Sequence, residues 1–184
     1  VGLQNFEFLW ESGKLLSLTK NTILYNLAFI LLGNLLAVVV AILLNEMRCK
    51  WFKKVSQTMM FLPYFISQVL VGFLVFNLLN YDTGFVNEIL TRLGMEKWGP
   101  YSDPHVWPVL LVIIYLWQQT GYNSVVYFAS ICGIDAEMIE ASKVDGANAF
   151  QRIRYILLPS LKPTVIILLL FALGGIVKGN FRLL

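Results

Sequence analysis

The sequence predicts an all-α protein, built as a polytopic bundle of transmembrane helices. Of its 184 residues, 58% are hydrophobic and 14% are charged, whereas soluble domains usually carry about 25% charged residues. The mean hydropathy is +0.69, and the charged residues cluster so that long stretches contain none. A large soluble core of buried helices is the alternative, and the composition and the clustering together disfavour it.

The uncharged stretches predict four spans. Three of them are longer than the about 20 apolar residues that a helix needs to cross a hydrocarbon core of about 30 Å. The fourth is shorter, but Lys162 and Lys178 flank it, and lysine side chains can extend their charged groups to the membrane surface. We therefore expect spans over about residues 21–45, 58–80, 106–133 and 161–178.

The positions of lysine and arginine predict the orientation of these spans. Residues 45–57 contain Arg48, Lys50, Lys53 and Lys54 against a single acidic residue, and four more basic residues lie within 135–163. In residues 80–105, four acidic residues outnumber two basic ones. Because loops rich in lysine and arginine stay in the cytoplasm, we expect 45–57 and 135–163 to lie inside. The N-terminal segment and 80–105 then lie outside.

Several classes of protein are disfavoured by the remaining residues. Cys49 and Cys132 lack the spacing of a metal site and lie near the predicted cytoplasmic side, so no disulfide is expected. His105 is the single histidine, and its proline-rich outer loop favours an interfacial role over a catalytic one. The chain has no GxxxxGK[ST] loop for ATP. We therefore expect no enzyme activity, no cofactor or metal in this chain, and no nucleic-acid partner.

The most polar segment, residues 135–160, predicts a helix–turn–helix on the cytoplasmic surface. Asp135 is placed to cap a first helix, and Gly146 can end it. Asn148 is placed to cap a second helix, and Pro159 is expected to stop that helix at the membrane face. On these features alone, the segment is an amphipathic hairpin at the membrane interface.

The order of residues in this segment also resembles the EAA loop of binding-protein-dependent ABC importer permeases. The family pattern is Glu-Ala-Ala, three residues, Gly, nine residues and Ile-x-Leu-Pro. Here it reads Glu140-Ala141-Ser142, Gly146 and Ile156-x-Leu158-Pro159, with serine at the third position, where alanine is usual. The stretches GLQNFEFLW, FLPYFISQV, DTGFVNEILTRLG and the region of Trp117 are similar to the sugar and polysaccharide branch of these permeases.

This resemblance implies a subunit of six spans in the bacterial cytoplasmic (inner) membrane, with the second to the fifth span in this chain. We therefore expect a fragment of a longer permease, in agreement with the missing initiator methionine. The EAA loop would dock on separate ATPase subunits, which bind ATP and Mg²⁺. The other implied partners are a second permease subunit, an extracytoplasmic solute-binding protein and membrane lipid. The residues expected to couple to the ATPase are Glu140, Ala141, Ser142, Asp145, Gly146, Ile156, Leu158 and Pro159.

The third span contains the candidate substrate path, because polar side chains within a span usually face a cavity or a partner helix. Tyr115, Gln119 and Tyr122 share one helical face, and Gln118 lies at its edge. Amides and aromatic rings suit sugars, and in maltose-type permeases the span before the EAA loop contributes sugar contacts. Hydrogen bonding between helices is an equal alternative. Lys178 follows the fourth span, where an interfacial position is favoured and a position on the path is the alternative.

These features together predict a permease for an oligosaccharide or a polysaccharide breakdown product. A cation on the path at Lys178 would suit an acidic cargo such as a uronide. One alternative is an importer permease for another solute, namely an amino acid, a peptide or an anion. The other is a membrane scaffold that keeps the cytoplasmic hairpin and transports nothing.

Overall fold

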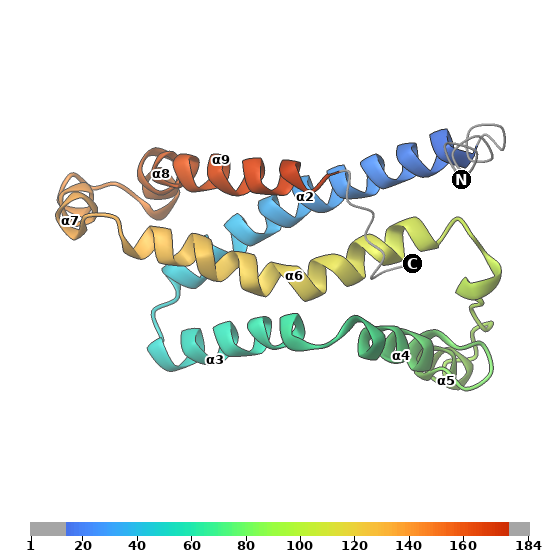
Figure 1. The fold of residues 1–184 in the computed structure, drawn as a ribbon. Coiled ribbons are helices and arrows are strands. Elements are labelled where there is room, and N and C mark those ends of the chain that lie inside the picture. Colours follow the sequence, from blue (N-terminus) through green and yellow to red (C-terminus); the bar gives the residue numbers. More distant parts are fainter. Residues whose placement is uncertain (1–13, 177–184) are drawn as a thin grey trace.

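The computed structural model describes residues 14–176 and confirms the all-α prediction, since every regular element in that range is helical. The long helices are joined by short turns, and one compact loop between α4 and α6 carries a small helix of its own (Figure 1). This loop is the one predicted to lie outside, and it is called the outer loop below. The elements are α2 (Lys14–Glu46), α3 (Lys50–Phe61), η1 (Leu62–Phe65), α4 (Gln68–Leu79), α5 (Phe85–Arg92), η2 (Pro100–Ser102), α6 (Trp107–Cys132), α7 (Ala136–Val144), α8 (Ala149–Arg152), η3 (Ile153–Leu157) and α9 (Leu158–Gly174).

Helices α2 and α6 form the centre of the bundle. Helix α9 packs against both of them, and α3 packs against α6 from the other side (Figure 1). Ala37 and Ala41 of α2 face Tyr127 of α6 in the buried core, and their small side chains let the two backbones approach closely. The Tyr127 hydroxyl donates to Oδ1 of Asn34 at 2.5 Å, so the buried phenol has a polar partner inside the bundle.

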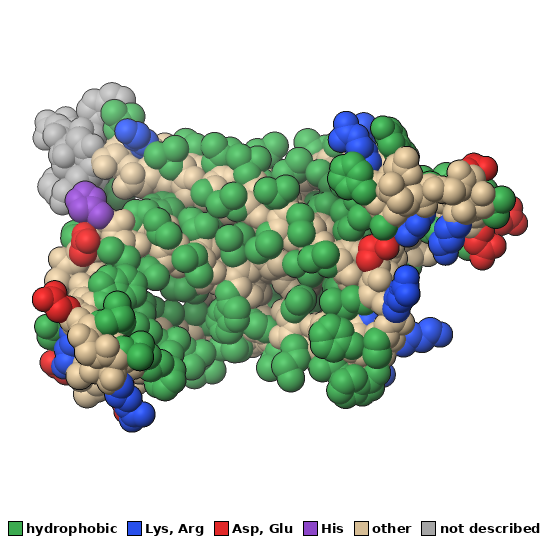
Figure 2. Space-filling view, turned by 180° about the vertical axis from the view of Figure 1, so that it is seen from behind, with side chains coloured by type: hydrophobic (Ala, Val, Ile, Leu, Met, Phe, Trp, Pro, Cys, Tyr) green, Lys and Arg blue, Asp and Glu red, His purple; other side chains and the backbone are tan. Residues whose placement is uncertain are grey.

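The surface of the bundle has the distribution expected for a protein in a bilayer. Large apolar side chains cover its middle, whereas charged side chains gather at the two ends (Figure 2). Two helical stretches are long and apolar enough to cross a membrane, Leu15–Glu46 and Ala149–Gly174, and a bent pair, Lys50–Phe65 with Gln68–Leu79, is a third candidate. Helix α6 also has the length of a span, with 26 residues. Its polar side chains make it less apolar than the stretches named above.

The stretch 58–80 differs from the single continuous helix that the sequence predicts. Helices α3 and α4 meet at an angle of 101°, separated by η1 and by extended backbone at Ile66 and Ser67. Pro63 begins the break because it has no N–H to continue the helical ladder. Ser67 then starts α4, and its hydroxyl oxygen accepts from the Leu70 N–H at 3.4 Å.

The polar hairpin begins with the caps that the sequence predicts. The Asp135 carboxylate accepts from the N–H of Glu137 at 2.9 Å. Asn148 and Gln151 form a reciprocal capping box at the start of α8. Between the two helices, Gly146 has a φ of +78°, which is the left-handed conformation that favours glycine at a helix end. These three predictions are confirmed.

The end of the second hairpin helix differs from the prediction. Pro159 does not stop it, because residues 149–174 run as one helical stretch through the π-helical segment η3 into α9. In a regular helix the ring of Pro159 would collide with the Tyr155 carbonyl four residues earlier. The wider π turn around Tyr155 removes that conflict. The hairpin is therefore joined rigidly to α9.

The orientation can be tested by cysteine labelling. Cys49 and Cys132 are exposed and free, so both are first replaced by serine. A cysteine at exposed Asp82 is expected to react with an impermeant maleimide on intact cells, and one at exposed Lys54 only after permeabilisation. The reverse pattern would overturn the orientation. Asn87 lies in the same loop but is unsuitable as a reporter, because it is only 2% exposed.

Candidate functional site

The first candidate site is the hairpin formed by α7, α8 and the turn between them. Helix α7 projects beyond the end of the bundle (Figure 1) and contains no buried residue. Glu140 and Ala141 are exposed on it, and the Ser142 hydroxyl is turned inward, donating to the Ile139 carbonyl at 2.7 Å. An exposed acidic helix with small side chains is accessible to a partner and permits close approach.

A shallow concavity of about 350 Å³ lies between the end of α7 and the helix that follows. Four of the residues predicted to couple to the ATPase line it, namely Ser142, Asp145, Gly146 and Ile156. Leu158 and Pro159 do not, because they belong to the start of α9. The concavity thus brings residues from the first and the last part of the EAA-like pattern onto one surface.

The same concavity contains residues that the sequence analysis missed. Gln151, Arg152 and Tyr155 line it from α8 and η3. All three lie within the nine-residue gap of the EAA-like pattern, which fixes no residue type there. The capping box signal of Asn148 and Gln151 could have placed Gln151 beside the turn.

The second candidate site is the aromatic face of α6. Tyr115 stacks on Phe29 of α2 with a centroid distance of 4.2 Å. Tyr122 stacks on Tyr64 of η1 at 4.4 Å, with an angle of 12° between the rings. Gln119 lies on the same face and is half-buried. The structure therefore brings each tyrosine against a ring of another helix, with the amide between them along α6.

Tyr122 and Tyr64 remain partly open, with exposed fractions of 39% and 38%. Phe61 and Phe65 extend this cluster, and their rings lie 5.0 Å apart, edge to face. Tyr64 is not among the candidates predicted from the sequence, although the aromatic run around Pro63 in FLPYFIS indicates it. Ring faces that stay accessible can stack on the C–H face of a sugar.

Gln118 is more deeply buried than Tyr115, Gln119 and Tyr122 on α6. It is 3% exposed, and its Nε2 donates to the Ile66 carbonyl at 2.9 Å, within the break between η1 and α4. Its Oε1 accepts from Nε2 of Gln68 at 2.7 Å. Backbone freed by a break inside a membrane needs such a partner. Gln118 thus links the broken helix to α6. These contacts correspond to the alternative of hydrogen bonding between helices.

Lys178, the remaining candidate for the path, lies outside the described residues 14–176.

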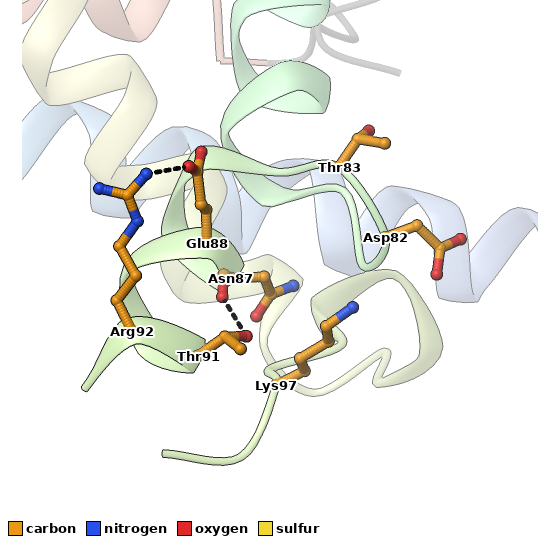
Figure 3. Close-up of a pocket in the computed structure, with 7 residues that line it drawn as sticks. All are labelled: Asp82, Thr83, Asn87, Glu88, Thr91, Arg92 and Lys97. Atoms are coloured by element: carbon orange, nitrogen blue, oxygen red, sulfur yellow. Dashed lines mark hydrogen bonds and ion pairs between the residues drawn. The ribbon is translucent and has the colours of Figure 1, made fainter. Parts of the chain in front are cut away.

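The outer loop forms a third surface, a concavity of about 380 Å³ on and around α5. Figure 3 shows Asp82, Glu88, Arg92 and Lys97 around it, with Arg92 paired to Glu88 at 2.6 Å. Asn87 holds the loop together, because its side-chain Nδ2 donates to the Trp98 carbonyl at 2.8 Å and its Oδ1 accepts from the Trp98 N–H at 2.7 Å. The loop is therefore a structured surface with mixed charges.

The helical bundle, the projecting hairpin and the broken second stretch define a membrane protein of the permease class. The family described as "Binding-protein-dependent transport system inner membrane component" matches residues 33–181. The chain belongs to this family, as its EAA-like pattern predicts.

Two named relatives are similar to this chain over almost its whole length. The chain is 32% identical over 182 residues to the polygalacturonan/rhamnogalacturonan transport system permease protein YteP of Bacillus subtilis, covering 99% of this chain and 57% of that protein. It is 29% identical to Protein LplB of the same organism, again with 99% and 57% covered. This chain therefore spans a little over half the length of these two relatives.

The structure is similar to that of a bacterial ABC transporter involved in the import of the acidic polysaccharide alginate. The TM-score is 0.92 at 32% sequence identity, covering 99% of this chain and 64% of that chain. A second structure of a bacterial alginate transporter, in complex with an alginate pentasaccharide-bound periplasmic protein, gives a TM-score of 0.91. The permease fold predicted from the sequence is confirmed.

Proposed function

We propose that this chain is part of a permease subunit that imports an acidic oligosaccharide across the bacterial inner membrane. The observation that carries the proposal is the similarity over almost the whole chain to the alginate importer. The relative that transports polygalacturonan and rhamnogalacturonan supports the same class of cargo. The matches favour this function over a scaffold without transport.

The projecting hairpin is the proposed contact with the ATPase. Glu140 and Ala141 on α7 are exposed, and the adjoining concavity at Gly146 can receive a side chain of the ATPase subunit. ATP and Mg²⁺ would be held by that separate subunit, where the hydrolysis of ATP would supply the energy. The hairpin is the part of this chain that the ATPase is proposed to move, and α8 continues through η3 into α9 without a break. A displaced hairpin would therefore displace α9.

The outer loop is the proposed contact with a solute-binding protein, and a second permease subunit completes the pore. Two acidic and two basic side chains lie around the α5 concavity, and hydrogen bonds between the Asn87 side chain and the Trp98 backbone hold the loop together. A pre-formed polar surface loses little conformational entropy when it binds a partner. The periplasmic protein bound in the alginate transporter is the corresponding partner there.

The aromatic face of α6 is the proposed contact with the cargo. Replacing Tyr115, Gln119 and Tyr122 together with alanine is expected to slow uptake of the oligosaccharide at least about tenfold, because each lost stacking or hydrogen-bond contact contributes about 1 kcal/mol. The measurement is uptake of labelled uronic-acid oligosaccharides by cells that carry the full subunit. The protein level in the membrane is the control. Normal uptake by the triple variant would place the cargo on another face.

Lys178 tests the acidic character of the cargo. Lys178→Gln is expected to slow uptake of a uronic-acid oligosaccharide far more than uptake of a neutral oligosaccharide of similar length, because only the former carries carboxylates that a cation can attract. Equal effects on both would assign Lys178 to the membrane interface. Uptake of an amino acid or a peptide by the wild-type importer, with no uptake of either sugar, would instead favour the alternative solutes.

A further inference from the structure

Arg152 of α8 lies at the base of the hairpin and joins it to the first helix of the bundle. Its Nη1 donates to the Ala147 carbonyl, in the turn between α7 and α8, at 3.1 Å. Its Nη2 lies 3.4 Å from Oε2 of Glu46, the last residue of α2. One guanidinium therefore contacts the turn of the hairpin and the end of a helix that lies 106 residues earlier in the chain.

This ion pair differs from an ordinary surface pair. The exposed fractions of the Arg152 and Glu46 side chains are 20% and 33%, whereas those of Arg92 and Glu88 are 76% and 57%. Within residues 14–176 these are the two ion pairs, and only that of Arg152 joins separate elements. Partial burial weakens screening by water and salt, so the attraction between Arg152 and Glu46 is screened less than that of an exposed pair at the same distance.

Glu46 is an unfavourable residue for its position in α2. The carbonyl end of a helix carries a partial negative charge, which repels a carboxylate and attracts basic groups. The last turn of α2 has no basic residue. A local conflict of this kind is expected where a side chain serves another purpose, and pairing with Arg152 offsets the repulsion.

Helix α2 can carry a displacement from Glu46 through the bundle. It is a continuous helix of 33 residues and packs along α6 through Ala37, Ala41 and the hydrogen bond between Asn34 and Tyr127. In the first half of α2, Nδ2 of Asn26 donates to the Ile176 carbonyl at 3.0 Å, just after the end of α9. Helix α7 itself has no buried residue, so the hairpin depends on its base for contact with α2.

We propose that the Arg152–Glu46 ion pair is a positioning link that transmits displacement of the hairpin to α2 and, through α2, to α6. The proposal rests on the proposed function, because it assumes that an ATPase displaces the hairpin. Helix α9 follows the hairpin through the continuous backbone, and the ion pair makes α2 follow as well. Helices α9 and α2, which both pack against α6, then move together.

The test is made on the full-length subunit, assembled with its ATPase, second permease subunit and binding protein in proteoliposomes. We expect both Glu46→Gln and Arg152→Gln to lower the stimulation of ATP hydrolysis by loaded binding protein about two- to fivefold. Glu46→Gln is expected to leave the ATPase associated, because Glu46 ends α2 and does not line the hairpin concavity. The exchanged pair, Glu46→Arg with Arg152→Glu, is expected to recover most of that stimulation. Arg154→Gln is the matched control, because Arg154 is exposed and lies on the same helical stretch.

Each outcome distinguishes the link from the proposed function. A wild-type subunit that does not associate with any ATPase contradicts the proposed function, whatever the variants do. A wild-type complex that responds normally, with full stimulation in both single variants, overturns the link. The link is also overturned if the exchanged pair responds no better than the single variants, or if Arg154→Gln lowers the stimulation as much as Arg152→Gln.

Discussion

Replacing Gly121 with valine is expected to remove most of the folded subunit from the membrane. Gly121 is buried in α6, where a Cβ atom would collide with the backbone carbonyl of Met60, near the end of α3. The obstacle is backbone and not the end of a flexible side chain, so relief requires that α3 and η1 move away from α6. Overpacking alone costs about 1–3 kcal/mol, and separating these helices also breaks the hydrogen bond from Gln118 to Ile66.

The measurement is the melting temperature of the purified subunit in detergent, together with its level in the membrane. Gly72→Val is the matched control, because Gly72 also lies within an apolar helix and a Cβ atom there meets nothing within 4 Å. We expect Gly72→Val to melt close to the wild type and Gly121→Val to melt far below it or to be degraded. Equal melting of the two variants would show that α3 and α6 do not approach each other as described.

Local signals were sufficient for much of the fold and for the hairpin. Uncharged stretches indicated the long helices, because bilayer thickness sets their length. Asp135, Gly146 and Asn148 act within one or two turns of the chain, so their effects can be read from neighbouring residues. The spacing of the EAA-like pattern indicated the family, since it fixes residue types at set intervals over about twenty residues.

Features that depend on distant partners could not be predicted in this way. The break at Ile66 is tolerated because Gln118, 52 residues later, satisfies its carbonyl. Pro159 stays within a helix because the preceding turn widens, a change that no single residue type encodes. Asparagine is a residue type usually found at the surface, but Asn87 is buried and its side chain bonds to the Trp98 backbone, 11 residues away. The pair of Arg152 and Glu46 likewise becomes visible only in three dimensions.

Reversing the charge of Glu140 or adding a side chain at Gly146 is expected to abolish association with the ATPase while the subunit stays folded. Glu140 is exposed on α7, so lysine there costs the isolated subunit little but repels basic groups of a docked partner. Gly146 has a φ of +78°, and a Cβ atom there meets nothing within 4 Å of this chain. Valine would strain that backbone by about 1–2 kcal/mol and change the angle at which α7 is presented.

Two variants on the outer loop separate docking from general damage. Glu88→Lys makes the same charge reversal on α5, and Gly94→Val makes the same strained substitution at a φ of +72° with open space around it. We expect Glu140→Lys and Gly146→Val to lower co-purification of the ATPase at least about tenfold, which corresponds to about 1.4 kcal/mol, and the two outer variants to leave it unchanged. Undiminished co-purification and transport with both hairpin variants would refute α7 as the docking helix. Equal losses from the outer variants would instead assign the defect to strain or charge, because a cytoplasmic ATPase cannot contact both ends of the bundle.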